Sequence, residues 1–388
     1  MSRGLLNSAL AGMGTSIFAE MSALAVETGS VNLGQGFPDT DGPAEVARVA
    51  ADAVLSGLGN QYPPGTGIPE LRTAIAAHQK RFYGVDLDPD TEVLVTAGAT
   101  EAIAASMLAL LEPGDEVIAL EPYYDSYAAC IAMAGARRVP VTLRGPLFRP
   151  DLDALRDAIT SRTRLILLNT PHNPTGMVAT ASELAVIAEL AIRHDLLVVT
   201  DEVYEHLVFD GEHIPIATLP GMRERTVTIS SGAKTFSFTG WKVGWVTAAP
   251  ELVTAVKTAK QFLTFVNGGP FQYAIAAGLA LPDAFYADAA ASLRRKRDLL
   301  AGGLREAGFE VFVPQGTYFI TTDIAALGES DGLEFCQSLP RRCGVVAVPN
   351  VVFYDDRQAG LTQVRFAFCK RDEVLAEAAE RLGRLRAH

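Results

Sequence analysis

Cysteine is scarce in this chain of 388 residues, and its four copies are widely spaced. Cys130, Cys336, Cys343 and Cys369 form no CxxC pair, and the six histidines form no HExxH motif or other clustered ligand set. This spacing argues against a disulfide framework and against a structural zinc site. We therefore expect four reduced thiols and no bound metal.

Long apolar runs and a basic surface are also missing. No uninterrupted apolar stretch reaches the ~18 residues that a membrane span needs. Residues 1–10 lack the basic region and apolar run of a signal peptide. The 33 Lys and Arg residues face 45 Asp and Glu, a net charge of −12, whereas nucleic-acid binding needs a basic surface. We expect a cytoplasmic protein that binds neither membrane nor nucleic acid.

Lysine is the rarest charged residue, so an enzyme using a lysine amine has few candidates here. The seven lysines are Lys80, Lys234, Lys242, Lys257, Lys260, Lys296 and Lys370. The remaining composition, 49% hydrophobic and 20% charged, is that of a folded enzyme. The length predicts about two or three domains.

From about residue 92 the sequence alternates short apolar segments with helical patterns. Strands are expected at 92–96, 116–120, 138–143, 164–169, 196–200, 227–230 and 243–248. Wholly apolar strands indicate a sheet covered on both faces, so we predict an α/β domain with largely parallel strands.

After Pro250 the pattern changes to long helical stretches over 251–306. Shorter strands at 309–313, 318–322, 345–348 and 363–368 and a helix at 372–385 follow. We expect a smaller α+β domain on a connecting helix. The first ~40 residues, with a helical pattern at 17–26, are expected to join it. The predicted division is 1–40, 41–275 for the large domain, and 276–388.

Open α/β sheets bind ligands beyond the carboxyl ends of their strands, so the residues there are the site candidates. Gly98-Ala99-Thr100 opens a helix after one strand and could hold a phosphate, although a plain turn would look the same. Tyr123, Tyr124 and Tyr127 follow the next strand and could either stack on a planar ligand or pack in the core.

Three further strand ends carry polar groups. Asn173 lies in the turn HNPTG, and Asp201 ends an apolar strand, where a buried acid needs a cation or a strong donor. Ser231, Lys234 and Lys242 follow the next strand, and a desolvated lysine there would be a nucleophile toward a carbonyl. Together they match what pyridoxal phosphate requires: an amine, a carboxylate for the pyridine nitrogen, donors for the ring oxygen and a phosphate cradle.

The motifs at these positions resemble those of the class I/II aminotransferases of pyridoxal-phosphate fold type I. The motifs are VNLGQGFPD, NQYPPGTG, EPYYDSY, HNPTG, DEVYEHL and KTFSFTGWKVGW. They are most similar to the kynurenine/glutamine, methionine and actinobacterial N-succinyldiaminopimelate aminotransferases. The resemblance implies a large domain with a mostly parallel seven-stranded sheet flanked by helices, plus the smaller α+β domain.

The resemblance also implies pyridoxal 5′-phosphate as cofactor and a role for each matching residue. Lys234 would form the Schiff base and shuttle the proton, and Asp201 would bind the pyridine nitrogen. Arg365 would hold the substrate carboxylate. Asn173 and Tyr204 would bind the ring oxygen, and Tyr124 would stack on the ring. The phosphate would be held by Ala99, Thr100, Ser231 and Lys242. In a homodimer Tyr62 would reach the phosphate of the neighbouring subunit, and the substrate pocket would be bordered by Gly36, Phe18 and Asn173.

Two positions depart from the broad family pattern. Lys242 stands where most members have Arg, which agrees with the kynurenine-type group. Gly232 stands where a larger residue is usual, which weakens the match at that position without changing the assignment of Lys234.

The predicted reaction is a ping-pong transamination between an amino acid and a 2-oxo acid. Phe18, Tyr123 and Tyr124 suggest an aromatic or neutral substrate of the kynurenine, glutamine or methionine type. The resemblance leaves N-succinyl-LL-diaminopimelate with glutamate/2-oxoglutarate equally open. A cysteine-conjugate C–S β-lyase is an alternative on the same scaffold. An effector-sensing regulator is more remote, because only 30 residues precede Val31.

Overall fold

The computed structural model describes residues 6–11, 13 and 16–387, and its largest element is a seven-stranded sheet. The strand order is β2-β8-β7-β6-β5-β3-β4, and every neighbouring pair is parallel except those made by β8. The strands are β2 (Val93–Thr96), β3 (Glu116–Glu121), β4 (Arg137–Thr142), β5 (Thr163–Asn169), β6 (Leu197–Asp201), β7 (Thr226–Ser231) and β8 (Gly244–Thr247). The predicted mostly parallel seven-stranded sheet is confirmed.

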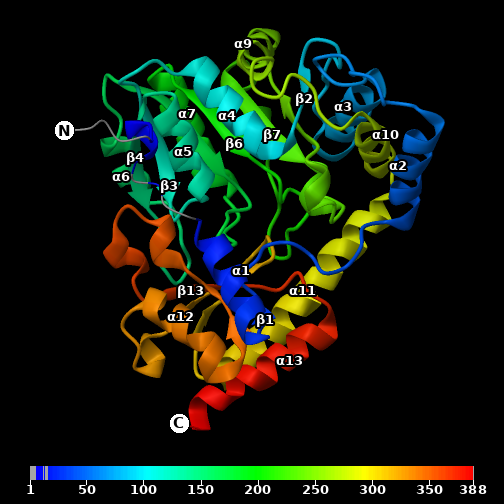
Figure 1. The fold of residues 1–388 in the computed structure, drawn as a ribbon. Coiled ribbons are helices and arrows are strands. Elements are labelled where there is room, and N and C mark those ends of the chain that lie inside the picture. Colours follow the sequence, from blue (N-terminus) through cyan, green and yellow to red (C-terminus); the bar gives the residue numbers. More distant parts are fainter. Residues whose placement is uncertain (1–5, 12, 14–15, 388) are drawn as a thin grey trace.

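The strands are short and apolar because both faces of the sheet are covered. Val117 and Ala119 of β3 belong to one hydrophobic core, whereas Ile118 and Leu120 of the same strand belong to another. Helices α4 (Gly98–Leu110), α5 (Asp125–Met133) and α9 (Pro250–Lys260) cover the first face. Helices α6 (Leu152–Asp157) and α7 (Ala181–Arg193) cover the second. Figure 1 shows α4, α5 and α7 around the strands.

A third core lies at the β2 edge of the sheet. Helices α2 (Ala44–Ser56), α3 (Pro69–Tyr83) and α10 (Gly269–Leu279) pack there against alternate side chains of β2 and β8. The strand-and-helix pattern read from residue 92 onward left α2 and α3 without an assignment.

The C-terminal part contains a four-stranded antiparallel sheet in the order β12-β13-β10-β9. Its strands are β9 (Glu310–Phe312), β10 (Phe319–Asp323), β12 (Val348–Pro349) and β13 (Gln363–Ala367). Its helices are α11 (Asp283–Glu306), α12 (Gly332–Cys343) and α13 (Asp372–Gly383). In Figure 1 the long helix α11 runs diagonally from α10 to this part. Short 3-10 helices lie at Ser8–Leu10, Ile216–Thr218, Arg223–Arg225, Thr239–Trp241, Ala325–Leu327, Asn350–Phe353, Arg357–Gly360 and Arg384–Ala387.

The N-terminal segment packs against the C-terminal part. Helix α1 (Ile17–Thr28) contacts α12, and β1 (Val31–Asn32) pairs in parallel with β11 (Val345–Val346). Figure 1 shows α1, in blue, beside the orange and red elements. The single strand expected at 345–348 is wrong, because β11 pairs with β1 while β12 pairs with β13. The domain boundaries after residues 40 and 275 stay a prediction.

Within the described residues, no helix is both long enough and apolar enough to cross a membrane.

Two adjacent glycines in α11 provide a matched test of the packing between α11 and α13. A Cβ at Gly303 would lie 2.4 Å from the Cβ of Ala379, whereas a Cβ at Gly302 would meet nothing within 4 Å. We expect Gly303→Ala to lower the free energy of unfolding by about 1–3 kcal/mol through overpacking. Gly302→Ala should raise it by about 0.5–1 kcal/mol, because alanine is the better helix former. Equal denaturation midpoints for the two variants would contradict this packing.

Candidate active site

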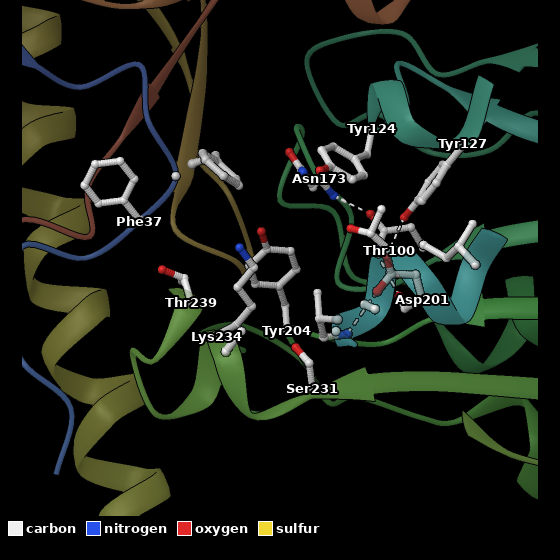
Figure 2. A pocket seen from close by; sticks show the side chains of 18 of the residues that line it. Phe37, Thr100, Tyr124, Tyr127, Asn173, Asp201, Tyr204, Ser231, Lys234 and Thr239 are labelled. Carbon is white, nitrogen blue, oxygen red and sulfur yellow. Dashed lines mark hydrogen bonds between the residues drawn. The ribbon is translucent and has the colours of Figure 1, made fainter. Parts of the chain in front are cut away.

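One cavity gathers nearly all of the predicted site residues. It lies beyond the carboxyl ends of β5, β6 and β7, where the C-terminal part and the N-terminal segment meet the large sheet. The predicted residues in its wall are Phe18, Gly36, Ala99, Thr100, Tyr124, Asn173, Asp201, Tyr204, Ser231, Lys234, Lys242 and Arg365. Figure 2 shows ten lining residues by label, with Lys234, Asp201 and Tyr204 converging from neighbouring elements.

Asp201 is a buried carboxylate at the end of β6, with 5% of its surface exposed. The Tyr127 hydroxyl donates to its Oδ2 at 2.7 Å, and the backbone N–H of Val203 donates to its Oδ1 at 3.3 Å. Burial raises the pKa of Asp201, although these two hydrogen bonds act in the opposite direction. A carboxylate in this position is stabilised by a cationic N–H donor in the cavity.

Lys234 lies on the short helix α8 (Gly232–Thr235), which begins directly after β7. Its Nζ lies 5.9 Å from the ring centre of Tyr204 and 5.7 Å from that of Tyr318. Burial lowers the pKa of Lys234, and the positive charges of Lys242 and Arg365 lower it further, against an opposing effect of Asp201. A lowered pKa increases the fraction of neutral amine, which is the form that attacks a carbonyl.

The N-terminus of α4 forms an anion cradle in the same cavity. Its N-cap residue, Ala97, makes no side-chain cap bond, so the first N–H groups of the helix face the cavity at Ala99 and Thr100. Gly98 has a φ of +75°, and a Cβ there would lie 3.3 Å from Nζ of Lys242. The absence of that Cβ lets the ammonium lie directly over the helix end. Ser231 adds a hydroxyl to the wall.

Arg365 is a buried guanidinium on β13, and only 1% of its surface is exposed. Its Nη1 donates to Oδ1 of Asn173 at 3.0 Å and its Nη2 to the backbone O of Gly34 at 3.2 Å, while its buried Nε has no hydrogen-bond partner. The guanidinium carbon of Arg365 lies 4.0 Å from the centre of the Phe319 ring. Burial lowers the pKa of Arg365 to about 10. These two hydrogen bonds use only part of the guanidinium, so its other N–H groups can bind a carboxylate ligand.

Aromatic rings and one backbone segment close the remaining sides. The Tyr204 and Tyr318 rings meet edge to face at 5.2 Å, and burial raises the pKa of the Tyr204 hydroxyl. The Tyr318 hydroxyl donates to the backbone O of Gly36 at 2.6 Å. A Cβ at Gly36 would lie 2.6 Å from the Phe319 ring, so only glycine fits there. The pKa of Tyr124 is raised by burial as well.

Two residues that the sequence pointed to do not line the cavity: Tyr123, whose hydroxyl donates to Asp355 at 2.9 Å, and Tyr62. The surface of Tyr62 is 83% exposed, and its ring lies 5.8 Å from that of Phe265, edge to face. Its predicted contact with a neighbouring subunit therefore stays a prediction.

Several residues in the wall of the cavity had no specific site role in the sequence motifs. They include Gln35, Phe37, Tyr127, Asn169, Thr239 and Phe319. Tyr127 is the most consequential, since it donates to Asp201. The sequence offered Tyr127 as a stacking or core aromatic, and its hydrogen bond to Asp201 was not predicted. Asn169 acts within the backbone, where its Nδ2 donates to the carbonyl of Asp201 at 2.8 Å.

The chain is similar to known proteins over nearly its whole length. Residues 28–382 match the family model of aminotransferase class I and II, and the chain belongs to this family. It is 55% identical over 379 residues, 95% of each chain, to a probable N-succinyldiaminopimelate aminotransferase from Mycobacterium tuberculosis. It is 41% identical to the methionine aminotransferase of Escherichia coli, over 96% of each chain.

The solved structures agree with the sequences. The structure of N-succinyldiaminopimelate aminotransferase from M. tuberculosis superposes with a TM-score of 0.96, covering 98% of this chain and all of that one. The protein is therefore a pyridoxal-phosphate-dependent aminotransferase of fold type I, as the sequence motifs predicted.

The cavity fits that cofactor. It offers a buried carboxylate, a lysine amine and an uncapped helix N-terminus beside a second lysine, each at a separate point of the wall. The departure at Gly232 also has a local reason. A Cβ there would lie 2.7 Å from Cδ1 of Ile275 on α10, so the close packing of α8 on α10 requires the small residue.

The Tyr127–Asp201 hydrogen bond predicts a pH effect. The bond favours the ionised carboxylate, so Tyr127→Phe should raise the pKa of Asp201 and shift the loss of kcat/KM on acidification to higher pH. At acidic pH we expect kcat/KM of Tyr127→Phe to be about tenfold below that of wild type, which corresponds to the loss of one hydrogen bond to a charged group. Tyr123→Phe is the control, because that hydroxyl donates to Asp355 at 2.9 Å. Identical acidic limbs for Tyr127→Phe and wild type would exclude this role.

Proposed function

We propose that this chain catalyses transamination between an amino acid and a 2-oxo acid, with Lys234, Asp201 and Arg365 as its principal groups. The observation that carries the proposal is their convergence. A lysine of lowered pKa, a buried acid and a buried guanidinium with an unpaired N–H line one cavity, although they come from two different sheets.

Pyridoxal phosphate, when bound, supplies a carbonyl carbon for amines and a ring that withdraws electrons from the substrate Cα. Asp201 would bind the ring nitrogen, Asn173 and Tyr204 the ring oxygen, and Tyr124 would stack on the ring. The first N–H groups of α4, at Ala99 and Thr100, would bind the phosphate. Ser231 and Lys242 would complete that cradle, with the helix N-terminus and the ammonium both favouring an anion.

Lys234 is the group that moves the proton. Its neutral amine would remove the proton from the substrate Cα. The resulting ammonium would then donate that proton to the cofactor carbon that takes over the amino group. Tyr204 and Tyr318 limit where the amine can reach, since both rings lie within 6 Å of Nζ. The burial that lowers the lysine pKa also excludes water, and both effects favour the neutral, nucleophilic amine.

Arg365 would bind the substrate α-carboxylate. Its position is held by Asn173 and the backbone O of Gly34, so the fork does not have to be ordered when the substrate binds. Phe18 and Gly36 border the same pocket, and the Phe18 ring centre lies 5.2 Å from the guanidinium carbon.

For the substrate we propose N-succinyl-LL-diaminopimelate with glutamate/2-oxoglutarate as the second pair. The 55% identity to the M. tuberculosis protein of that name supports this choice. Neutral or aromatic amino acids are the second candidate, because Phe18, Phe37 and Phe319 line the cavity. The cationic side chains of the described lining are Lys234, Lys242 and Arg365, so a distal carboxylate would need a group beyond this wall.

We also propose that the enzyme is a homodimer in which Tyr62 reaches the phosphate site of its partner. An exposed apolar patch of Tyr62, Phe262, Leu263 and Phe265 supports this. The patch borders the anion cradle, because the hydroxyl of Thr264 donates to Glu101 of α4. Apolar patches of this kind mark protein–protein contacts. A cytoplasmic location likewise remains a prediction.

A panel of amino donors tests the proposed substrate. N-succinyl-diaminopimelate should bleach the cofactor absorbance of the holoenzyme at lower concentration than kynurenine, glutamine, methionine or glutamate. Lys234→Ala should abolish turnover with every donor. Pyruvate and ammonia released from a cysteine conjugate without an oxo acid would favour the β-lyase reaction instead. Absorbance that no donor bleaches would contradict transamination.

Hybrid dimers test the role of Tyr62. Lys234→Ala and Tyr62→Ala chains are mixed and allowed to exchange subunits. If Tyr62 serves the partner's site, each hybrid contains one intact site, so an equimolar random mixture should recover about a quarter of wild-type activity. If Tyr62 serves its own site, mixing should restore nothing beyond the activity of the parent chains.

A further inference from the structure

A cluster of metal-ligating side chains lies outside the cofactor cavity, on the far side of the turn that carries Tyr204. His78 comes from the last part of α3, and Glu205 and His206 follow directly after Tyr204. One ligand atom from each of these three side chains lies within 4.8 Å of the others. None of the three lines the cofactor cavity.

The two imidazoles point their Nε2 atoms at one another, 2.7 Å apart. At this separation one of the two nitrogens must present a lone pair. The ring that presents this lone pair is a neutral imidazole. Neutral imidazole is the form that binds metals. The Nδ1 atom of His78 is buried and has no hydrogen-bond partner, so the ring's polar contact is made through Nε2.

Glu205 brings a buried negative charge to the same place. It is 5% exposed. The groups that hydrogen-bond to it, Ser230 at 2.6 Å and Tyr83, are neutral. The neighbouring carboxylate, Glu202, has its own partner in His213 at 2.9 Å.

A cation would therefore pair with a buried carboxylate whose hydrogen-bond partners within the described residues are neutral hydroxyls. We propose that His78, Glu205 and His206 bind one divalent transition-metal ion, Zn²⁺ being the one that best matches two imidazoles and a carboxylate. The three side chains fill three positions of a tetrahedral site, and the Tyr83 hydroxyl or a water takes the fourth.

The geometry needs only a small adjustment for zinc. Zinc–nitrogen bonds of about 2.0–2.1 Å place two tetrahedral ligands roughly 3.3 Å apart, so the two Nε2 atoms have to separate by about 0.6 Å. The rings of Phe82 and Tyr286 form the wall of the site, 4.7 and 4.3 Å from the His206 ring. His206 itself is half-buried and is the most accessible of the three side chains.

The metal would hold the turn at residues 202–207 against α3. Tyr204, in the middle of this turn, lines the cofactor cavity, and Asp201 ends the strand that leads into it. The ion would therefore be structural: it would fix the back of the turn whose front carries two groups of the active site, and it would not touch the substrate.

Metal content of the purified holoenzyme tests the proposal. Protein without a histidine tag is stripped with a chelator, exposed to Zn²⁺, freed of excess metal, and assayed for zinc and for pyridoxal phosphate. We expect about one zinc per wild-type chain and less than about 0.2 in His206→Gln and Glu205→Gln. The control is His194→Gln, at the exposed end of α7, which should bind as wild type does. Zinc bound to the cofactor would appear equally in all variants and would refute the site.

Two further measurements keep the test decisive if a variant folds poorly. Zn²⁺ should raise the unfolding temperature of wild type and His194→Gln by several degrees and leave that of His206→Gln unchanged. Co²⁺ in the wild-type protein should give the intense visible bands of a four-coordinate site, at longer wavelength than the cofactor absorbs. Wild-type protein that retains less than about 0.1 zinc per chain, or that binds Co²⁺ only with the weak bands of a six-coordinate ion, overturns the proposal. Cofactor absorbance and donor bleaching are read separately, so failure of the metal site is distinguishable from failure of the aminotransferase assignment.

Discussion

The structure depends on two buried charged groups that have no oppositely charged partner within hydrogen-bond distance in the described part of the chain. Asp201 and Arg365 are both nearly inaccessible, and neither is paired with an oppositely charged side chain at hydrogen-bond distance among the described residues. Isolated burial of either group is costly. Tyr127 and Asn173 reduce that cost with neutral hydrogen bonds, but the Nε of Arg365 stays unpartnered. The remaining balance must come from ligands, which makes the cavity a site for a cationic ring nitrogen and for a carboxylate.

The fold meets this constraint by setting two sheets against one another. Asp201 is placed by a parallel sheet that is covered on both faces, and Arg365 by a separate antiparallel sheet. The N-terminal segment then crosses between them: Gly34 accepts from Arg365, Gly36 from Tyr318, and Phe37 from Lys370 through its backbone O. Because these contacts use backbone carbonyls, they fix the path of the segment through its main chain. Position 36 also requires glycine, because a Cβ there would lie 2.6 Å from the Phe319 ring.

Much of the large sheet could be predicted because its strands carry their own signal. A run such as LLVV is apolar at every position, and only burial on both faces requires that. The division of 345–348 into two strands could not be predicted. Its first half pairs with β1, more than three hundred residues earlier, and its second half pairs with β13, fewer than twenty residues later. Most of the cavity was accessible to strand-end reasoning and to family motifs. The role of the Tyr127 hydroxyl was not, since it acts only through a carboxylate 74 residues later.

The turn after β6 shows how closely site and scaffold are joined. The segment that presents Val203 and Tyr204 to the cavity presents Glu205 and His206 to its back. Apolar residues at these positions would pack against Phe82 and Tyr286 without any need for partners. The chain instead buries a carboxylate and two imidazoles there, which is expensive unless they bind something. A cluster that holds the back of the turn would also hold Tyr204 in place, and a bound cation gives a physical reason for its polar composition.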